Sequence, residues 1–234
     1  MNVSDPVGAG YVASLARPGG NVTGFAFVEY GMGGKWLELL KEIAPRVTRV
    51  AILRDPTLAV GIGQLGAILS VAPSFNVEAS PMDVRNTDEI ERTITDFARI
   101  ANGGLIVTSS PGALFNRKLI TALAARHRLP AVYFLRDFVR DGGLISYGPD
   151  SVAAYGQAAS YVDRILKGEK PADLPVQAPT KNELVINLKA AKALGLAIPP
   201  AVLARADARI DLANVRFWPK ADMSLCAAHV RYRG

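Results

Sequence analysis

Polar side chains follow the ends of several short apolar runs in this sequence. The run Pro130 to Phe134 leads into a charged turn that carries Arg136, and earlier runs lead into Asp55, Thr57 and Ser110. A guanidinium group and the backbone N–H groups of helix N-termini both favour a carboxylate. The pattern therefore predicts a site for a small anionic or zwitterionic ligand, although each loop taken alone is equally typical of ordinary solvated chain.

The sequence offers little for catalysis. A hydrolase needs a base beside its nucleophile, and the two histidines are His127 and His229. We expect His127 at the end of a helix that returns to the start of a strand, on the edge away from the polar loops. Ser109 and Ser110 are then better interpreted as hydrogen-bond donors. We therefore expect a binding protein and no enzymatic activity.

One glycine motif is similar to a nucleotide site. Gly61 to Gly66 fit the pattern G-x-G-x-x-G, and Asp83 lies near the spacing of the acid that binds a ribose. In a Rossmann turn the first glycine follows the strand almost at once, whereas here several residues, including Pro56, separate Leu53 from Gly61. A nucleotide-binding Rossmann enzyme or a cytoplasmic ligand sensor remains the alternative hypothesis, and we predict no cofactor.

Strands and helices are predicted to alternate at least four times between Val47 and Tyr147. Apolar runs such as Leu105 to Thr108 are typical of buried strands, and Thr87 to Ala101 is predicted to be a helix that opens with a capping box at Asn86 and Glu89. This alternation predicts a parallel sheet with helices on both faces, joined by right-handed crossovers. Ligands of such sheets bind at the carboxyl ends of the strands, where the polar residues lie.

Composition excludes several other classes of protein. The net charge is +6, but about half of it comes from residues 205–234 and no basic stripe with interleaved aromatic residues occurs, so we expect no nucleic-acid partner. A single cysteine, Cys226, excludes an internal disulfide, and no zinc-ligand spacing is present, so we predict no metal. No apolar run reaches the ~18 residues of a membrane span, so we expect no direct membrane insertion.

Several longer strings together carry a family resemblance. They are DPVGAGYVASLARPGGNVTGF, the helix LELLKEIAP before RVAIL, LAARHRLPAVYFLRDFV with GGLISYGPD, and YVDRILKGEKPADLPVQAPTKNELVINLKAAKALGL. From Ser4 to about Asp207 the chain resembles ABC-transporter substrate-binding proteins of the periplasmic binding protein type I fold, in the subfamily with tryptophan-binding members. The resemblance implies two Rossmann-like α/β lobes, with parallel sheets and helices on both faces, that close on an amino-acid-like or other organic solute.

The resemblance also implies a domain division and a set of site residues. Residues 1–46 would be a remnant of the first lobe, 47–148 the second lobe, 149–207 a return to the first lobe, and 208–234 an unmatched tail for which we expect disorder. The cleft residues expected on this basis are Asp5 from the first lobe and Asp55, Thr57, Ser110, Phe134, Arg136 and Tyr147 from the second. Arg136 is expected to pair with a ligand carboxylate, or alternatively to bridge Asp137 or Asp141. An ABC permease is the implied partner.

The chain departs from this family in three places. Relatives have an export signal and several strand-helix units before the position of Asp5; they often carry Asn-Pro where this chain has Arg54-Asp55-Pro56; and residues 211–234 have no counterpart. We therefore expect a truncated form with an incomplete first lobe and apolar faces, such as Trp36, Leu39 and Leu40, without full cover. Poor solubility and weak or absent ligand binding would follow. The family resemblance predicts a periplasmic protein, whereas the chain as written predicts a cytoplasmic one.

Overall fold

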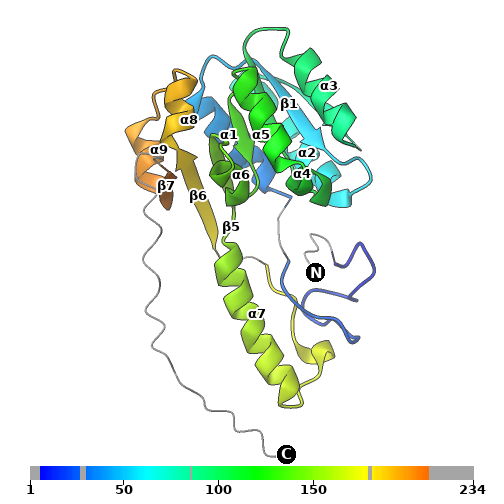
Figure 1. The fold of residues 1–234 in the computed structure, drawn as a ribbon. Helices are drawn as coiled ribbons and strands as arrows, with labels where there is room; N and C mark the ends of the chain where they lie inside the picture. The colour runs from blue at the N-terminus through cyan, green and yellow to red at the C-terminus, as the bar shows by residue number, and fades with distance from the viewer. Residues whose placement is uncertain (1–5, 27–29, 85, 179–180, 211–234) are drawn as a thin grey trace, which may run out of the picture.

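The computed structural model describes residues 6–26, 30–84, 86–178 and 181–210. Its centre is one sheet of seven strands in the order β2-β1-β3-β4-β5-β6-β7 (Figure 1). Neighbouring strands run parallel except at the β5–β6 pair, which is antiparallel. The strands are β1 (Arg49–Arg54), β2 (Glu78–Asp83), β3 (Gly103–Val107), β4 (Ala131–Tyr133), β5 (Ile145–Pro149), β6 (Asn182–Asn187) and β7 (Ala208–Ile210). The predicted α/β class with a mostly parallel sheet is confirmed.

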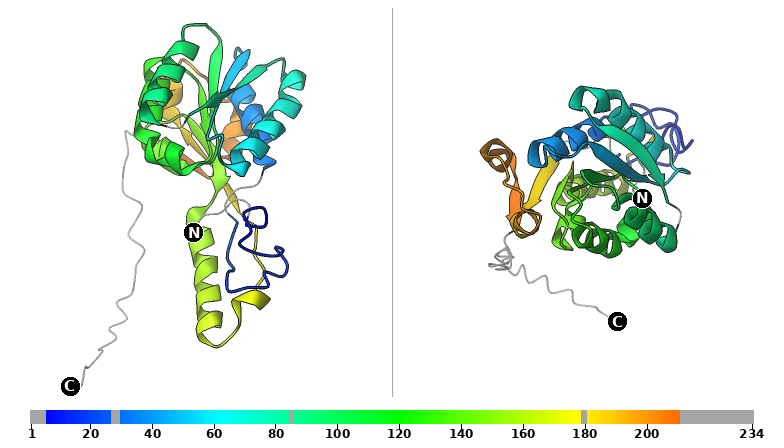
Figure 2. Two further views of the ribbon diagram at one scale, coloured as in Figure 1. Left: turned by 90° about the vertical axis from the view of Figure 1, so that its right-hand side faces the viewer. Right: turned by 90° about the horizontal axis from the view of Figure 1, so that it is seen from above.

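Helices cover both faces of this sheet (Figure 2). Among them α1 packs against α2, and α3 packs against α5. The α-helices are α1 (Met32–Ile43), α2 (Ala59–Val71), α3 (Thr87–Phe97), α4 (Pro111–Phe115), α5 (Arg117–Arg126), α6 (Arg136–Arg140), α7 (Ser151–Leu166), α8 (Leu188–Ala193) and α9 (Pro200–Arg205), and the short 3-10 helices are η1 (Ala72–Phe75) and η2 (Pro171–Asp173). The charged segment after β4, predicted to be a turn, is the short helix α6.

Local sequence explains several of these boundaries. Asn86 caps α3, because its side chain accepts a hydrogen bond from the Glu89 N–H at 2.9 Å, as the capping pattern predicts. The strand β3 is buried along its whole length and shows no alternation, which is typical of a parallel strand covered on both faces. At Gly104 a Cβ atom would lie 3.0 Å from the side chains of Leu40 and Val47, so a glycine lets α1 pack closely on the sheet.

Two predicted lobe boundaries differ from the structure. The helix α1 was assigned to the first lobe, yet its residues Trp36, Leu39 and Leu40 are fully buried in the core around this sheet. Residues 182–207 were also assigned to the first lobe, whereas β6 pairs with β5 and extends the same sheet to β7. The apolar faces predicted to be uncovered are therefore covered. We call residues 30–149 and 181–210 the α/β layer.

A second, smaller part of the molecule lies beyond the ends of β5 and β6 (Figures 1 and 2). It consists of residues 6–26 and 150–178, which include α7 and η2, and we call it the outlying region. Tyr161 of α7 holds it together, because its hydroxyl donates to the Pro175 carbonyl at 2.8 Å and its ring contacts Phe25. Thr23 also donates a hydrogen bond to the Leu174 carbonyl. The chain thus leaves the layer after Pro149 and returns to it at Lys181. The predicted tail begins with β7, and residues 211–234 lie outside the described residues.

Candidate functional site

The register of the sheet brings the predicted site residues to one edge. Leu53 lies level with Val107, Val107 with Tyr133, and Tyr133 with Ser146. The residues that follow these four positions therefore lie side by side, with neighbouring strands roughly 4.8 Å apart. We call residues 54–57, 108–110, 134–136 and 147–150 the strand-exit edge. It contains every predicted site residue except Asp5, which lies outside the described residues.

The loop after β1 is organised by its own side chains. The Asp55 Oδ1 atom accepts hydrogen bonds from the Thr57 backbone N–H at 2.9 Å and from the Thr57 hydroxyl at 2.6 Å. This Asx turn leads the chain into α2 and leaves Thr57 exposed. Arg54 turns to the neighbouring strand and forms two hydrogen bonds with the carboxylate of Asp83. Asp83, the candidate ribose acid, is therefore engaged by an arginine.

The loop after β3 combines a predicted residue with one that sequence reasoning missed. The Ser110 hydroxyl oxygen accepts a hydrogen bond from the Ala113 N–H at 3.0 Å and so caps α4. The preceding Ser109 N–H donates to Oε1 of Gln64 at 3.0 Å. The Gln64 side chain is fully buried in α2, and its Nε2 group has no hydrogen-bond partner among the described residues. Gln64 lies inside the glycine motif, and a glutamine among apolar helix positions was the signal that could have identified it.

The two predicted aromatic residues have different environments. Phe134 is buried and its ring meets Phe138 edge-on, with the ring centroids 5.4 Å apart, so it belongs to the core. Tyr147 is partly exposed and packs against that core. Its backbone carbonyl accepts a hydrogen bond from the Trp36 indole N–H at 2.7 Å. Of the two aromatic rings, Tyr147 is therefore the one with surface at the strand-exit edge.

Arg136 forms an ion pair that local sequence did not reveal. Its Nη1 atom lies 2.8 Å from Oε2 of Glu183 on β6, and the exposed fractions of the two side chains are 24% and 7%. Neither proposed local bridge forms, because Asp137 pairs with Arg140 and Asp141 with Arg117. Burial raises the pKa of the Glu183 carboxyl, and the positive charge of Arg136 acts in the opposite direction.

The glycine motif has a packing explanation. Gly61, Gly63 and Gly66 lie within α2, whereas a nucleotide fingerprint would open the helix. A Cβ atom on Gly63 would come within 2.5 Å of the Tyr30 ring, and one on Gly61 would lie 3.0 Å from the Asp55 carbonyl oxygen. Gly61 and Gly63 therefore allow close contact between neighbouring segments. The expectation that the motif is not a nucleotide site agrees with this geometry.

Groups for other chemistry do not gather at the edge. In the described part of the chain no three His, Cys, Asp or Glu side chains cluster so as to hold a metal ion. His127 caps the C-terminal end of α5, just before the start of β4 and thus away from the strand-exit edge, as predicted. Within the same residues no helix combines the length and apolar character needed to cross a membrane.

Comparison with known proteins places this arrangement in a family. The profile of the ABC transporter substrate binding protein family matches residues 1–210. A tyrosine-binding protein of Clostridioides difficile (strain R20291) is 26% identical over 200 residues, which are 83% of this chain and 55% of the relative. The chain therefore spans about half the length of this curated relative.

Two crystal structures share the fold. An ABC domain from Streptococcus pneumonia in complex with L-Trp superposes with a TM-score of 0.80 at 27% identity, over 89% of this chain and 72% of that chain. A conserved domain protein from Vibrio cholerae O1 biovar El Tor gives a TM-score of 0.81 at 28% identity, over 90% of this chain and 70% of that chain.

Proposed function

We propose that this chain, which belongs to the family of ABC transporter substrate binding proteins, binds a small solute at its strand-exit edge and delivers it to an ABC permease. The observation that supports this most directly is the sheet register, which brings polar side chains from separate loops to one edge. In open α/β sheets this edge is where ligands bind. The outlying region lies beyond the same edge, so a ligand there would have chain on two sides (Figure 1).

We infer that the solute is an amino acid or a similar zwitterion. One relative is named a tyrosine-binding protein and another was crystallised with L-Trp. Among the predicted site residues of this edge are a carboxylate, two hydroxyl groups, a partly exposed tyrosine and a guanidinium, which match the charges and ring of such a ligand. The residues proposed to contact it are Asp5, Asp55, Thr57, Ser110, Arg136 and Tyr147, with Phe134 shaping the wall from behind.

Arg136 is the proposed partner of the ligand carboxylate. A guanidinium has five N–H donors, and Glu183 accepts from Nη1 alone. About a quarter of the side chain is exposed, so a ligand at the edge can reach the remaining outer donors. Glu183 then has a positioning role, because its buried carboxylate holds the guanidinium in one orientation.

The proposed activity is binding without chemistry. The family is one of substrate-binding proteins, and the described residues at the edge include no histidine beside a nucleophile. We infer that the protein works in the periplasm or outside the cell, since that is where members of this family meet their solutes, and that it needs no cofactor. A nucleotide-binding Rossmann enzyme is disfavoured by the glycines inside α2 and by the Arg54–Asp83 ion pair.

A ligand screen tests this proposal. The 234-residue chain is heated with L-tyrosine, L-tryptophan, NAD or ATP while its unfolding is followed, and the two amino acids should raise the midpoint because they bind the folded state. Stabilisation by NAD or ATP alone would favour the nucleotide-binding Rossmann enzyme over the amino-acid-binding protein.

Substitutions at Arg136 test the site itself. Arg136→Ala should weaken amino-acid binding by about tenfold or more, because a charge-assisted hydrogen bond contributes roughly 1.5–3 kcal/mol. Arg136→Lys keeps a positive charge for Glu183 and should bind with intermediate affinity. Arg140→Ala, in the same helix, is the matched control, because Arg140 is exposed and pairs with Asp137. Equal affinities in all three variants would remove Arg136 from the site.

A further inference from the structure

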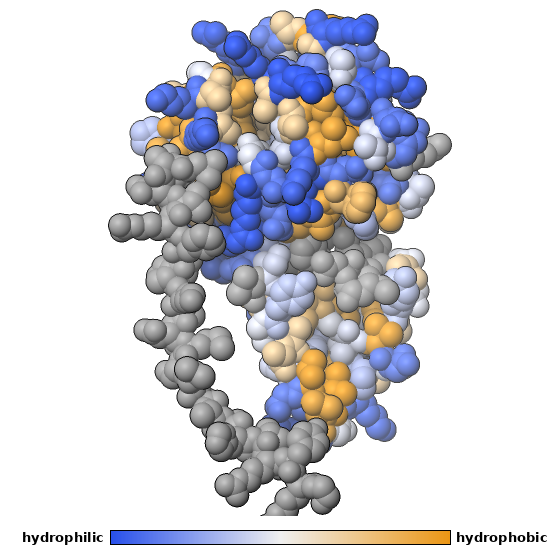
Figure 3. Space-filling model, in the orientation of Figure 1, coloured by the Kyte–Doolittle hydropathy of each residue, from blue (hydrophilic) through white to orange (hydrophobic). Residues whose placement is uncertain are grey.

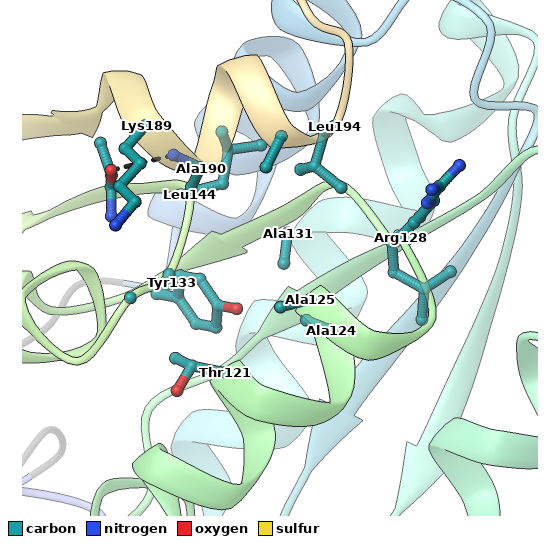
Figure 4. Close-up of a pocket in the computed structure, with 15 residues that line it drawn as sticks. Thr121, Ala124, Ala125, Arg128, Ala131, Tyr133, Leu144, Lys189, Ala190 and Leu194 are labelled. Carbon is teal, nitrogen blue, oxygen red and sulfur yellow. Dashed lines mark hydrogen bonds between the residues drawn. The ribbon is translucent and has the colours of Figure 1, made fainter.

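A pocket of about 300 Å³ opens between α5 and α8, on a part of the α/β layer that the proposed solute site does not use (Figure 4). Alanine and leucine side chains form most of its walls, and Ala131 and Tyr133 of β4 line its inner side. No described residue that lines it belongs to the strand-exit edge. Its volume is at the lower end of the range for small-molecule sites, about 300–1,000 Å³.

The inner side of this pocket carries a hydroxyl group that has no hydrogen-bond partner in the described part of the chain. The Tyr133 side chain is fully buried, and its hydroxyl makes no hydrogen bond to any described residue. Its ring stacks on Phe138 and also lies against Gly143, where a Cβ atom would come within 2.5 Å of the ring, so the ring is packed against both residues. Figure 4 shows the hydroxyl pointing into the pocket, toward Ala125 and Ala131. Burial raises the pKa of this phenol, which keeps it protonated as a donor.

The charged groups around the pocket are both cations. Arg128 and Lys189 lie toward its opposite ends, and its described lining includes no carboxylate (Figure 4). Neither side chain forms an ion pair or hydrogen bond with another described residue. The pocket therefore combines apolar walls with a positive charge that no described residue pairs.

The backbone at Arg128 strengthens this observation. Arg128 follows α5 with a φ angle of +53°, in the left-handed region that favours glycine at the end of a helix. The other described non-glycine residues with positive φ are Asn76 and Asn102, a residue type that tolerates this conformation. An arginine at such a position is held at an energetic cost, which is typical of functional sites.

We propose that this pocket binds a small aliphatic carboxylic acid that carries a second polar group at its far end. The carboxylate pairs with Arg128 at the mouth, the hydrocarbon lies along the alanine and leucine walls, and the far polar group accepts a hydrogen bond from the Tyr133 hydroxyl. Lys189 contributes positive potential from the other end. This site is independent of the solute site at the strand-exit edge.

Three related compounds test the proposal by isothermal titration of the 234-residue chain. The probe is 8-hydroxyoctanoate; octanoate lacks the far hydroxyl, and 1,8-octanediol lacks the carboxylate. The unaltered chain should bind the probe saturably at millimolar concentration or below. Both other compounds should bind more weakly.

Two variants assign these preferences to residues. Tyr133→Phe should weaken probe binding by roughly threefold to tenfold and remove the preference over octanoate. Arg128→Gly should weaken it by about tenfold and remove the preference over the diol. Both variants should fold. The first removes a hydroxyl that no described residue hydrogen-bonds, and the second places glycine at a left-handed position. The control is Lys192→Gln. Lys192 lies on α8, as Lys189 does, but it does not line the pocket, so this variant should bind the probe like the unaltered chain.

The outcomes separate a built site from general binding to apolar surface. The proposal is supported if Tyr133→Phe loses the preference for the probe over octanoate and Arg128→Gly loses the preference for the probe over the diol. Lys192→Gln should keep both preferences. Equal probe affinity in the unaltered chain, Tyr133→Phe and Arg128→Gly overturns it. Failure of the unaltered chain to bind the probe saturably at millimolar concentration overturns it as well.

Discussion

The α/β layer and the outlying region bury their apolar side chains to very different degrees. In the layer one continuous core runs from Met32 to Val202 through all the strands of the central sheet except β7. In the outlying region the buried apolar side chains among the described residues are Val12, Tyr161, Leu174 and Val176, together with Pro6 and Pro18. There α7 exposes Tyr155, Val162 and Leu166 to 68%, 55% and 81%, and Figure 3 shows apolar surface at the end of this region far from the layer.

This difference indicates which part of the chain stabilises itself. A sheet covered by helices on both faces has its own core and can fold as a unit. The outlying region depends on a few hydrogen bonds and ring contacts around Tyr161. We therefore expect it to open with a lower free energy than the layer does.

The largest expected effect is that of Trp36→Ala. Trp36 is fully buried in the layer, and its indole N–H donates to the Tyr147 carbonyl. Removing the ring should lower the free energy of unfolding by about 3–5 kcal/mol, as for other buried tryptophans. Urea denaturation followed by circular dichroism measures this loss. Tyr155→Ala, an exposed aromatic residue in α7, should change the same quantity by less than about 0.5 kcal/mol. Similar losses for the two variants would contradict the comparison.

Tyr161→Phe should loosen the outlying region alone. The change removes the hydrogen bonds that join the Tyr161 hydroxyl to Pro175 and Gln177, which contribute roughly 1 kcal/mol each. Amide hydrogen exchange in residues 151–166 should then become roughly fivefold to thirtyfold faster, while exchange in β3 stays the same. Equal acceleration in both places would show that the two regions unfold together.

A smaller effect concerns pH and the Arg136–Glu183 pair. Because burial raises the Glu183 pKa, the folded state binds a proton more tightly than the unfolded chain does. The stability from this group is complete below the usual glutamate range and is lost as pH rises through the raised value. Relative to Glu183→Gln, the unaltered chain should therefore lose free energy of unfolding as pH rises across that window.

Denaturant titrations at a series of pH values measure this slope. Glu91→Gln changes an exposed carboxylate that lies 4.0 Å from Arg126, and its slope should match that of the unaltered chain. A slope of the opposite sign for Glu183 would mean that the attraction of Arg136 outweighs the burial.

The smallest expected change in stability is that of Leu166→Gln. The side chain is largely exposed, so the free energy of unfolding should change by less than about 0.5 kcal/mol. Self-association should nevertheless fall, because an exposed apolar residue has been replaced. Sedimentation velocity over a concentration series measures this, with Lys167→Gln as the neighbouring control. Unchanged association in Leu166→Gln would show that this surface is not the one through which chains associate.

Sequence reasoning succeeded where the pattern is local. The alternation of predicted strands and helices along the chain predicted the parallel sheet. The position of polar residues directly after the apolar strands predicted that these polar residues share one edge of the sheet. It failed where distant segments meet. The partner of Arg136 is Glu183, which lies 47 residues away, whereas sequence alone suggested only the neighbours Asp137 and Asp141. The pairing of β6 with β5 was not predicted for the same reason, because nothing local to β6 shows it.

The chain leaves the layer after β5 and returns to it before β6 at a single point. The Asp150 N–H donates to the Lys181 carbonyl at 3.0 Å, and the two side chains form an ion pair at 3.1 Å. Seen from the layer, β5 and β6 are therefore an antiparallel hairpin whose connection has been enlarged into a whole segment, residues 151–180. An insertion that starts and ends at one place can be exchanged or shortened to a tight turn without moving the strands beside it. The Asp150–Lys181 junction is thus the natural place to graft a different segment onto this sheet.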